Sequence, residues 1–204
     1  MQEAKNIIFD MGGVFLNIDY KKTEQAFIDL GVEKFVQFFK QDYSSHLFED
    51  LETGEIDVPH FYAEFRRETQ KNLSDEVIKK AWNAMLGNFP PERLKWLKEI
   101  KNKYNVYLYS NTNQIHYDFI METFRRENGQ PNFNDYFKKA YYSHEVHLRK
   151  PVTSSYTKLL ALAGLVAEET LFIDDTLNNV EGAAASGMQT IYLKPPMTVL
   201  DLKL

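Results

Sequence analysis

Five side chains of this 204-residue chain could act together on a charged ligand, because each lies at the end of an apolar run or at a break before a helix. They are Asp10, Ser110, Lys150, Asp174 and Asp175. In a parallel α/β sheet the carboxyl ends of the strands meet at one edge, and ligands bind there. We therefore expect these five side chains to converge on a single site.

Three of the five side chains are carboxylates, which repel one another unless a cation lies among them. Oxygen ligands in a chain without cysteine suit a hard divalent cation such as Mg²⁺. A carboxylate beside such a cation can attack phosphorus, while Lys150 balances the charge and holds a phosphoryl oxygen. These residue types predict phosphoryl transfer through a covalent intermediate on Asp10.

Five apolar runs, rich in β-branched or aromatic residues, predict the strands that position these side chains. The runs are 7–9, 106–109, 140–142, 170–173 and 189–193. They alternate with segments of helical periodicity, which indicates an α/β protein. We expect a doubly wound, Rossmann-like parallel sheet of about five strands.

The segment 21–86 contains no β-branched run, and its apolar residues recur at helical spacing. Asp57 and Ser74 have the pattern of helix N-termini. A phenylalanine-rich stripe that passes through 35–39 is more typical of a helical core than of a cofactor site. We therefore predict a small all-helical cap inserted after the first strand. The predicted boundaries are 19–86 for the cap, and 1–18 with 87–204 for the catalytic core.

The composition is that of an ordinary soluble protein, with 44% hydrophobic residues, 26% charged residues and a formal net charge of -5. A nucleic-acid surface would need clustered Lys and Arg. The absence of cysteine excludes disulfides and thiolate chemistry. No run approaches a membrane span, and the N-terminus lacks a secretory pattern. We expect a cytoplasmic protein that binds a small molecule, with no nucleic-acid or membrane partner, and the oligomeric state is open.

Four stretches resemble the motifs of the haloacid dehalogenase-like (HAD) hydrolase superfamily, in the order that the superfamily shows. They are IFDMGGV at 8–14, YSNTN at 109–113, RKP at 149–151, and FIDD at 172–175 with its continuation to 184. The resemblance implies a Rossmann-like core with a helical cap. It also implies a magnesium-dependent phosphatase that hydrolyses a small phosphorylated metabolite, for which a sugar phosphate is expected.

The resemblance implies a role for each matching residue. The implied catalytic residues are Asp10, Ser110 and Lys150, the substrate-binding residues are Ser110, Asn111 and Lys150, and the metal ligands are Asp10, Gly12, Asp174 and Asp175. Asp10 is expected to be both nucleophile and ligand, and Gly12 to offer its backbone carbonyl. Of the last pair, Asp175 is the expected direct ligand and Asp174 lies adjacent or in the outer shell.

Two positions depart from the pattern of most phosphatases in the superfamily. Gly12 stands where a second Asp usually protonates the leaving group, a contribution of about 10²–10⁴-fold. This form is similar to bacterial glucose-1-phosphate phosphatases, so a sugar-1-phosphate, whose leaving group depends less on an acid, is a narrower hypothesis. Asn179 stands where many relatives carry a carboxylate, which lowers the negative charge available to a metal.

Three other functions remain open. A non-catalytic module that binds phosphate or a partner would explain the missing acid. A haloacid dehalogenase would use Asp10 against a carbon–halogen bond without a metal, which the paired Asp174 and Asp175 argue against. A receiver domain would be shorter and would lack the cap. Further candidate contacts to the substrate are Asp19, as a substitute acid, Tyr20, Phe48, Glu49 and His116.

Overall fold

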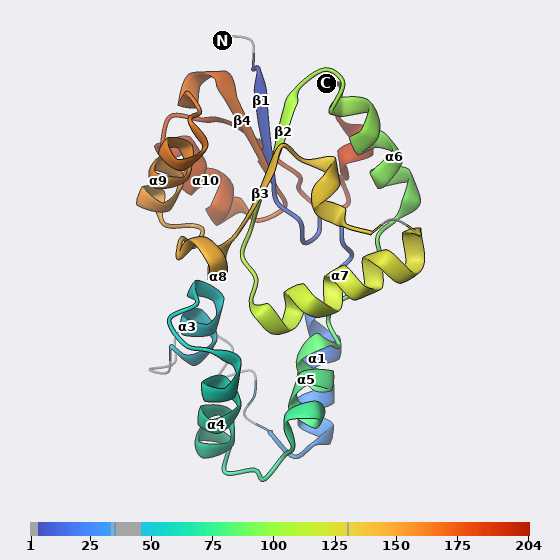
Figure 1. The fold of residues 1–204 in the computed structure, drawn as a ribbon, viewed down its shortest axis with the longest axis vertical. Coiled ribbons are helices and arrows are strands. Elements are labelled where there is room, and N and C mark those ends of the chain that lie inside the picture. The colour runs from blue at the N-terminus through green and yellow to red at the C-terminus, as the bar shows by residue number, and fades with distance from the viewer. Residues whose placement is uncertain (1–3, 34, 36–45, 130) are drawn as a thin grey trace.

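The computed structural model describes residues 4–33, 35, 46–129 and 131–204. Apart from Phe35, the phenylalanine-rich stripe expected at 35–39 lies outside the described residues. In Figure 1 the described chain forms a sheet flanked by helices in the upper half and a group of helices in the lower half. The carboxyl ends of the strands face the lower group, so a site at that edge lies between the two halves.

Five strands form a single parallel sheet in the order β3-β2-β1-β4-β5. Their bounds are Asn6–Phe9 for β1, Asn105–Ser110 for β2, Lys139–Tyr142 for β3, Thr170–Asp174 for β4 and Gln189–Tyr192 for β5. Strand β1 is central, and all four of its residues are buried, which explains why the three after Asn6 are apolar without alternation. The predicted doubly wound parallel sheet is confirmed.

Helices cover both faces of the sheet. Helices α6 (Pro91–Ile100) and α7 (Gln114–Asn128) pack on one face, and α9 (Thr153–Ala163) and α10 (Leu177–Ala185) pack on the other. Successive residues of β1 therefore belong to different apolar clusters, because strand side chains alternate between faces. The short α8 spans Ser143–Val146, and 3₁₀ turns span Phe133–Tyr136, Ala167–Glu169 and Val199–Asp201.

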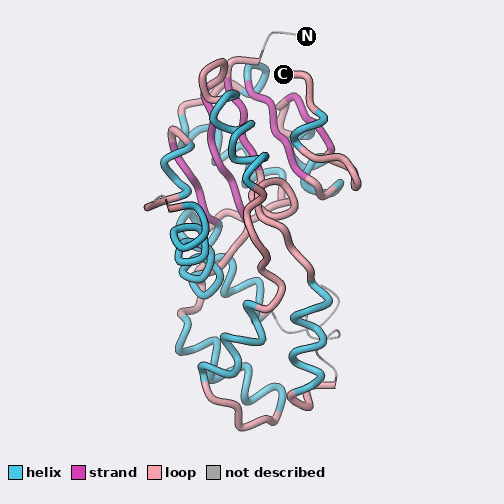
Figure 2. The backbone as a smooth tube through the Cα atoms, turned by 90° about the vertical axis from the view of Figure 1, so that its right-hand side faces the viewer, coloured by secondary structure: helices cyan, strands magenta, loops and turns pink. Residues whose placement is uncertain are grey.

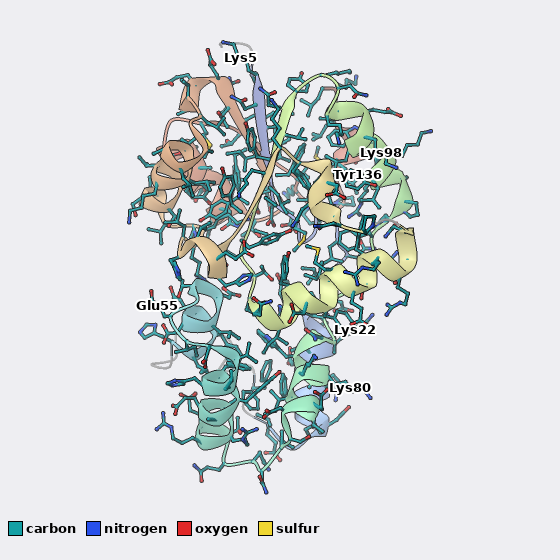
Figure 3. The ribbon with its side chains drawn as sticks, in the orientation of Figure 1. Lys5, Lys22, Glu55, Lys80, Lys98 and Tyr136 are labelled. Carbon is teal, nitrogen blue, oxygen red and sulfur yellow. The ribbon has the colours of Figure 1, made fainter. Side chains whose placement is uncertain are left out.

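A contact between a lysine and an aromatic ring joins α6 to the 3₁₀ turn at Phe133–Tyr136. Lys98 and Tyr136 lie side by side in Figure 3, with the Lys98 Nζ 5.6 Å from the centre of the tyrosine ring. Among the described residues, no helix combines the length and the apolar character that a membrane crossing requires.

The lower half consists of helices and loops, without a strand among its described residues, as Figure 2 shows. The helices are α1 (Tyr20–Asp29), α3 (Leu47–Thr53), α4 (Val58–Thr69) and α5 (Asp75–Asn83). They surround an aromatic core that includes Phe27, Phe61 and Trp82. Asp57 and Ser74 accept hydrogen bonds from backbone N–H groups of the first turns of α4 and α5, so the two predicted N-caps are confirmed.

Two neighbouring chain segments join the helical half to the sheet. Ile18 and Leu86 form an isolated antiparallel bridge, and the Gly87 N–H donates to the Asn17 carbonyl at 2.8 Å. The predicted boundaries of the cap fall within this paired stretch. The division of the chain into two domains stays a prediction.

Candidate active site

The ends of the three central strands place three of the predicted site residues around one cavity. Asp10 directly follows β1, Ser110 is the last residue of β2, and Asp175 follows β4. Together with Lys150, they line a cavity of about 390 Å³ that also contacts the helical cap. Gly12 and Asn111 line the same cavity. The parallel order of the strands thus brings together residues that are up to 165 positions apart in the sequence.

Lys150 lies at the centre of the charged cluster. Its Nζ is 2.7 Å from Asp10 Oδ1 and donates to Asp174 Oδ2 at 2.7 Å. Lys150 is only 1% exposed and Asp174 is completely buried. The ammonium group therefore holds two carboxylates that would otherwise repel each other in a site with little water.

Asn111 fixes the backbone of Lys150. The Lys150 N–H donates to Asn111 Oδ1 at 3.0 Å, and Asn111 Nδ2 donates to the Lys150 carbonyl at 3.0 Å. Asn111 lines the cavity, so its contact with substrate stays a prediction, and both ends of its side-chain amide bind the Lys150 backbone. Its side chain therefore positions the lysine, a role that the sequence did not indicate.

Asp174 and Asp175 lie in different surroundings although they are adjacent. Asp174 accepts hydrogen bonds from Lys150, from the Thr176 N–H at 2.8 Å and from Asn179 Nδ2 at 3.0 Å. Asp175 lines the cavity, whereas Asp174 lies beneath it. Asn179 thus uses its amide to orient a carboxylate, and Asp175 is the member of the pair that faces the cavity.

The electrostatics of the cluster reflect an excess of negative charge. Burial raises the pKa of Asp10 to about 7; Lys150 opposes this shift, and Asp174 adds to it. Burial also raises the pKa of Asp175, with a contribution from Asp174. Burial disfavours the charged form of Lys150, but Asp10 and Asp174 outweigh it and raise its pKa. One lysine therefore does not compensate three carboxylates.

The three carboxylates can hold a metal ion. One oxygen from each of Asp10, Asp174 and Asp175 lies within 4.8 Å of the others. A cluster made of oxygen atoms with a net negative charge suits Mg²⁺, which also retains water molecules and accepts phosphate oxygens. The donor set therefore fits the cation that the sequence predicted.

Two glycines after Asp10 make room for neighbouring side chains. A Cβ atom on Gly13 would lie 1.8 Å from Asp175 Oδ2, and the φ angle of Gly13 is +70°, so only glycine fits there. A Cβ atom on Gly12 would lie 2.6 Å from Ile18 Cδ1. The space into which a side chain at position 12 would extend is therefore occupied by an apolar group.

The cap contributes a wall of aromatic and apolar residues. Tyr20, Phe48 and Trp82 line the cavity, and His116 of α7 does so beside them. Asp19, considered as a substitute acid, does not line it; its carboxylate instead accepts from the Lys21 N–H at the start of α1. The acid that Gly12 lacks is therefore not replaced by Asp19.

An ion pair that the sequence did not indicate connects the cap to the lysine motif. Arg149 Nε donates to Glu52 Oε2 at 2.8 Å, and its Nη1 lies 3.8 Å from Glu49 Oε1. Arg149 and Glu52 both line the cavity, whereas the predicted contact residue Glu49 does not. The sequence pointed to Arg149, because it directly precedes Lys150 in the RKP motif, but nothing in the sequence pointed to Glu52.

Comparisons with known proteins identify the family. Residues 4–187 match the family described as haloacid dehalogenase-like hydrolase. This chain belongs to the haloacid dehalogenase-like hydrolase family, as the four motifs predicted.

Named relatives cover nearly the whole chain. A D-ribitol-5-phosphate phosphatase from Bacteroides thetaiotaomicron is 30% identical over 91% of this chain and 90% of its own length. A sesquiterpene phosphatase from Aspergillus oryzae is 26% identical over 98% of this chain and 95% of its own length. A solved HAD family enzyme from Bacteroides thetaiotaomicron, in complex with magnesium and inorganic phosphate, is 32% identical to this chain. The two structures match with a TM-score of 0.85 over 95% of this chain and 96% of the other. These names are not those of glucose-1-phosphate phosphatases, so that branch stays a prediction.

Proposed function

We propose that this protein is a magnesium-dependent phosphatase that hydrolyses a small phosphorylated metabolite through an aspartyl-phosphate on Asp10. The observation that carries the proposal is the cluster of three carboxylates, two of them paired with the buried Lys150, at a cavity of about 390 Å³. The phosphatase names of two relatives and the magnesium and phosphate of a similar solved enzyme support it.

In this proposal each part of the cluster has a separate task. The Asp10 carboxylate attacks phosphorus, the bond to the leaving oxygen breaks, and water then hydrolyses the acyl phosphate to release inorganic phosphate. Lys150 holds Asp10 in place and, with Ser110, binds phosphoryl oxygens. Asp10, the Gly12 carbonyl and Asp175, with Asp174 beside them, would hold Mg²⁺, which when bound would supply positive charge to neutralise the phosphoryl group.

The leaving group narrows the choice of substrate. Gly12 offers no acid, and Ile18 fills the space beside it, so the proton that the departing oxygen needs comes from water or from the substrate. An anomeric phosphate leaves more easily than a simple alkoxide, which favours sugar-1-phosphates. A polyol phosphate, by analogy with the ribitol-5-phosphate relative, is the competing substrate class.

A non-catalytic phosphate-binding module is the second candidate, because the space at position 12 has no acid. It predicts that phosphate and magnesium bind but that no phosphate ester is hydrolysed. A dehalogenase remains a weaker alternative, because its chemistry uses Asp10 without a metal.

Turnover of p-nitrophenyl phosphate, with and without Mg²⁺, tests the proposal. We expect hydrolysis that requires Mg²⁺ and is abolished by EDTA. Binding of Mg²⁺ and phosphate without turnover of any ester would favour the binding module. Assays of sugar-1-phosphates, sugar-6-phosphates and polyol phosphates then decide the substrate class, and a clear preference for the 6-phosphates would contradict the anomeric hypothesis.

A further inference from the structure

The cavity extends beyond the charged cluster to a region lined by the cap, where few polar groups meet a ligand. Tyr20, Glu52, His116 and Arg149 are polar residues of this region. Glu52 and Arg149 bind each other at 2.8 Å. His116 is the histidine of the cavity lining, and the phosphatase chemistry proposed above does not use it.

The ring of His116 is fixed in one orientation. Its Nε2 lies 3.2 Å from the Trp82 carbonyl, and the ring stacks on the Trp82 indole with centroids 4.7 Å apart and planes 25° apart. Asn113 accepts a hydrogen bond from the His116 N–H and anchors the residue in the first turn of α7. A rigid side chain of this kind can recognise a ligand at little entropic cost.

The tautomer of His116 follows from its partner. A carbonyl oxygen only accepts hydrogen bonds, so Nε2 carries the proton. Burial lowers the pKa of His116 to about 4, so the ring is neutral near pH 7 and Nδ1 carries a lone pair. The hydrogen bonds of His116 within the described part of the chain engage its backbone N–H and Nε2, which leaves Nδ1 for a ligand.

We infer that His116 is a specificity-determining residue whose Nδ1 accepts a hydrogen bond from a substrate hydroxyl group, so that the site selects hydroxylated phosphate monoesters over apolar ones. The inference rests on the proposed phosphatase function and specifies its substrate class. Ile18, Met85 and Leu86 line the same cavity and offer only apolar side chains, so a substrate hydroxyl that meets Nδ1 gains a partner that these side chains do not provide.

A pair of substrates of equal chain length tests the inference. Ribitol 5-phosphate and pentyl phosphate differ in their hydroxyl groups, and kcat/KM is measured for both. We expect wild-type protein to prefer the polyol by about tenfold or more, and His116→Phe to lose about tenfold of this preference, the value of one hydrogen bond. His116→Asn, whose Oδ1 can replace the Nδ1 acceptor, should retain more of the preference than His116→Phe.

His144→Phe is the matched control, because His144 is a second histidine whose pKa burial lowers but which does not line the cavity. It should leave the substrate ratio unchanged. Equal hydrolysis of both substrates by wild-type protein overturns the inference even if no variant folds. An equal loss of kcat/KM for both substrates in His116→Phe also overturns the inference, because it indicates a structural role for His116. Turnover of p-nitrophenyl phosphate separates these outcomes from failure of the phosphatase proposal, in which no ester is hydrolysed.

Discussion

At the rim of the sheet, Lys150 lies 2.7 Å from both Asp10 and Asp174, whereas at the cap side of the same cavity Trp82 and His116 meet through stacked rings. The rim is a network of charges in which Asp174 alone accepts from three donors. The cap side is built largely from apolar contacts, and Arg149 pairs with Glu52 and, at a longer distance, with Glu49 of the cap.

This difference separates two tasks. A charged network that is satisfied by fixed partners can stabilise the same phosphoryl group whatever it is attached to. An apolar wall with few polar groups discriminates among the remaining parts of substrates, because each unmatched hydroxyl loses its hydrogen bonds there. We therefore expect changes at the rim to lower activity on every substrate and changes at the cap side to alter selectivity.

Asp10→Asn should give the largest effect, because it removes the proposed nucleophile. We expect kcat for p-nitrophenyl phosphate to fall at least about 10⁴-fold while the circular dichroism spectrum is retained. Asp19→Asn is the matched control, since Asp19 does not line the cavity. Retained activity in Asp10→Asn would remove Asp10 as nucleophile.

Lys150→Met should destabilise the protein as well as inactivate it. The change leaves Asp10 and Asp174 buried without their cation, and breaking a buried pair costs about 3–5 kcal/mol of unfolding free energy. Urea unfolding measures the loss. Lys158→Met, at an exposed lysine of α9, should stay within about 0.5 kcal/mol of wild type. If Lys150→Met lowered the unfolding free energy by less than about 1 kcal/mol, the ion pairs of Lys150 with Asp10 and Asp174 would not stabilise the fold as described.

His116 should make the stability of the cap side depend on pH. Its folded pKa of about 4 lies below the unfolded value of 6.5, so the unfolded state takes up the proton first as the pH falls. The stabilisation is complete above pH 6.5 and is lost as the pH falls toward 4. Between pH 7 and pH 5, wild-type protein should lose roughly 2 kcal/mol more than His116→Gln. Parallel pH profiles of unfolding free energy would contradict this account.

Thr23→Val should weaken the cap without altering the rim. The buried Thr23 hydroxyl accepts from the Met85 N–H at 2.9 Å and lies 3.0 Å from the Ala81 carbonyl. Leaving this N–H without a partner should cost about 1–3 kcal/mol, measured by urea unfolding. Thr23→Ser keeps the hydroxyl and should retain most of the stability. A fall in kcat for p-nitrophenyl phosphate comparable to that of Lys150→Met would contradict the separation of tasks.

Glu52→Gln should give the smallest effect, because Glu52 and Arg149 are both 20% exposed and water screens their ion pair. We expect a loss of stability of about 1 kcal/mol or less, with a rise of KM and little change of kcat. Glu49→Gln is the control, since its pair with Arg149 is longer, at 3.8 Å. A large fall of kcat in Glu52→Gln would show that the Glu52–Arg149 ion pair also affects the position of Lys150 and would contradict the separation of tasks.

Much of the fold was predictable because its signals are local. The central strand β1 is buried on both faces, which favours the continuous apolar run 7–9, and an acid placed directly after this run has to lie at the rim. The N-caps Asp57 and Ser74 likewise satisfy donors only a few residues away. The contacts of Asn111 with the Lys150 backbone and of Glu52 with Arg149 had no such local signal.

The sequence alone indicated the class of chemistry, because carboxylates and a hydroxyl at strand ends, with a lysine shortly before a helix, meet at one rim in a parallel sheet of this order. Only the tertiary structure decided how they are supported. Asn111 binds the backbone of Lys150, 39 residues away, and His116 binds the carbonyl of Trp82, 34 residues away. Such partners are chosen by the packing of separate elements, and neither spacing nor residue type reveals that packing in advance.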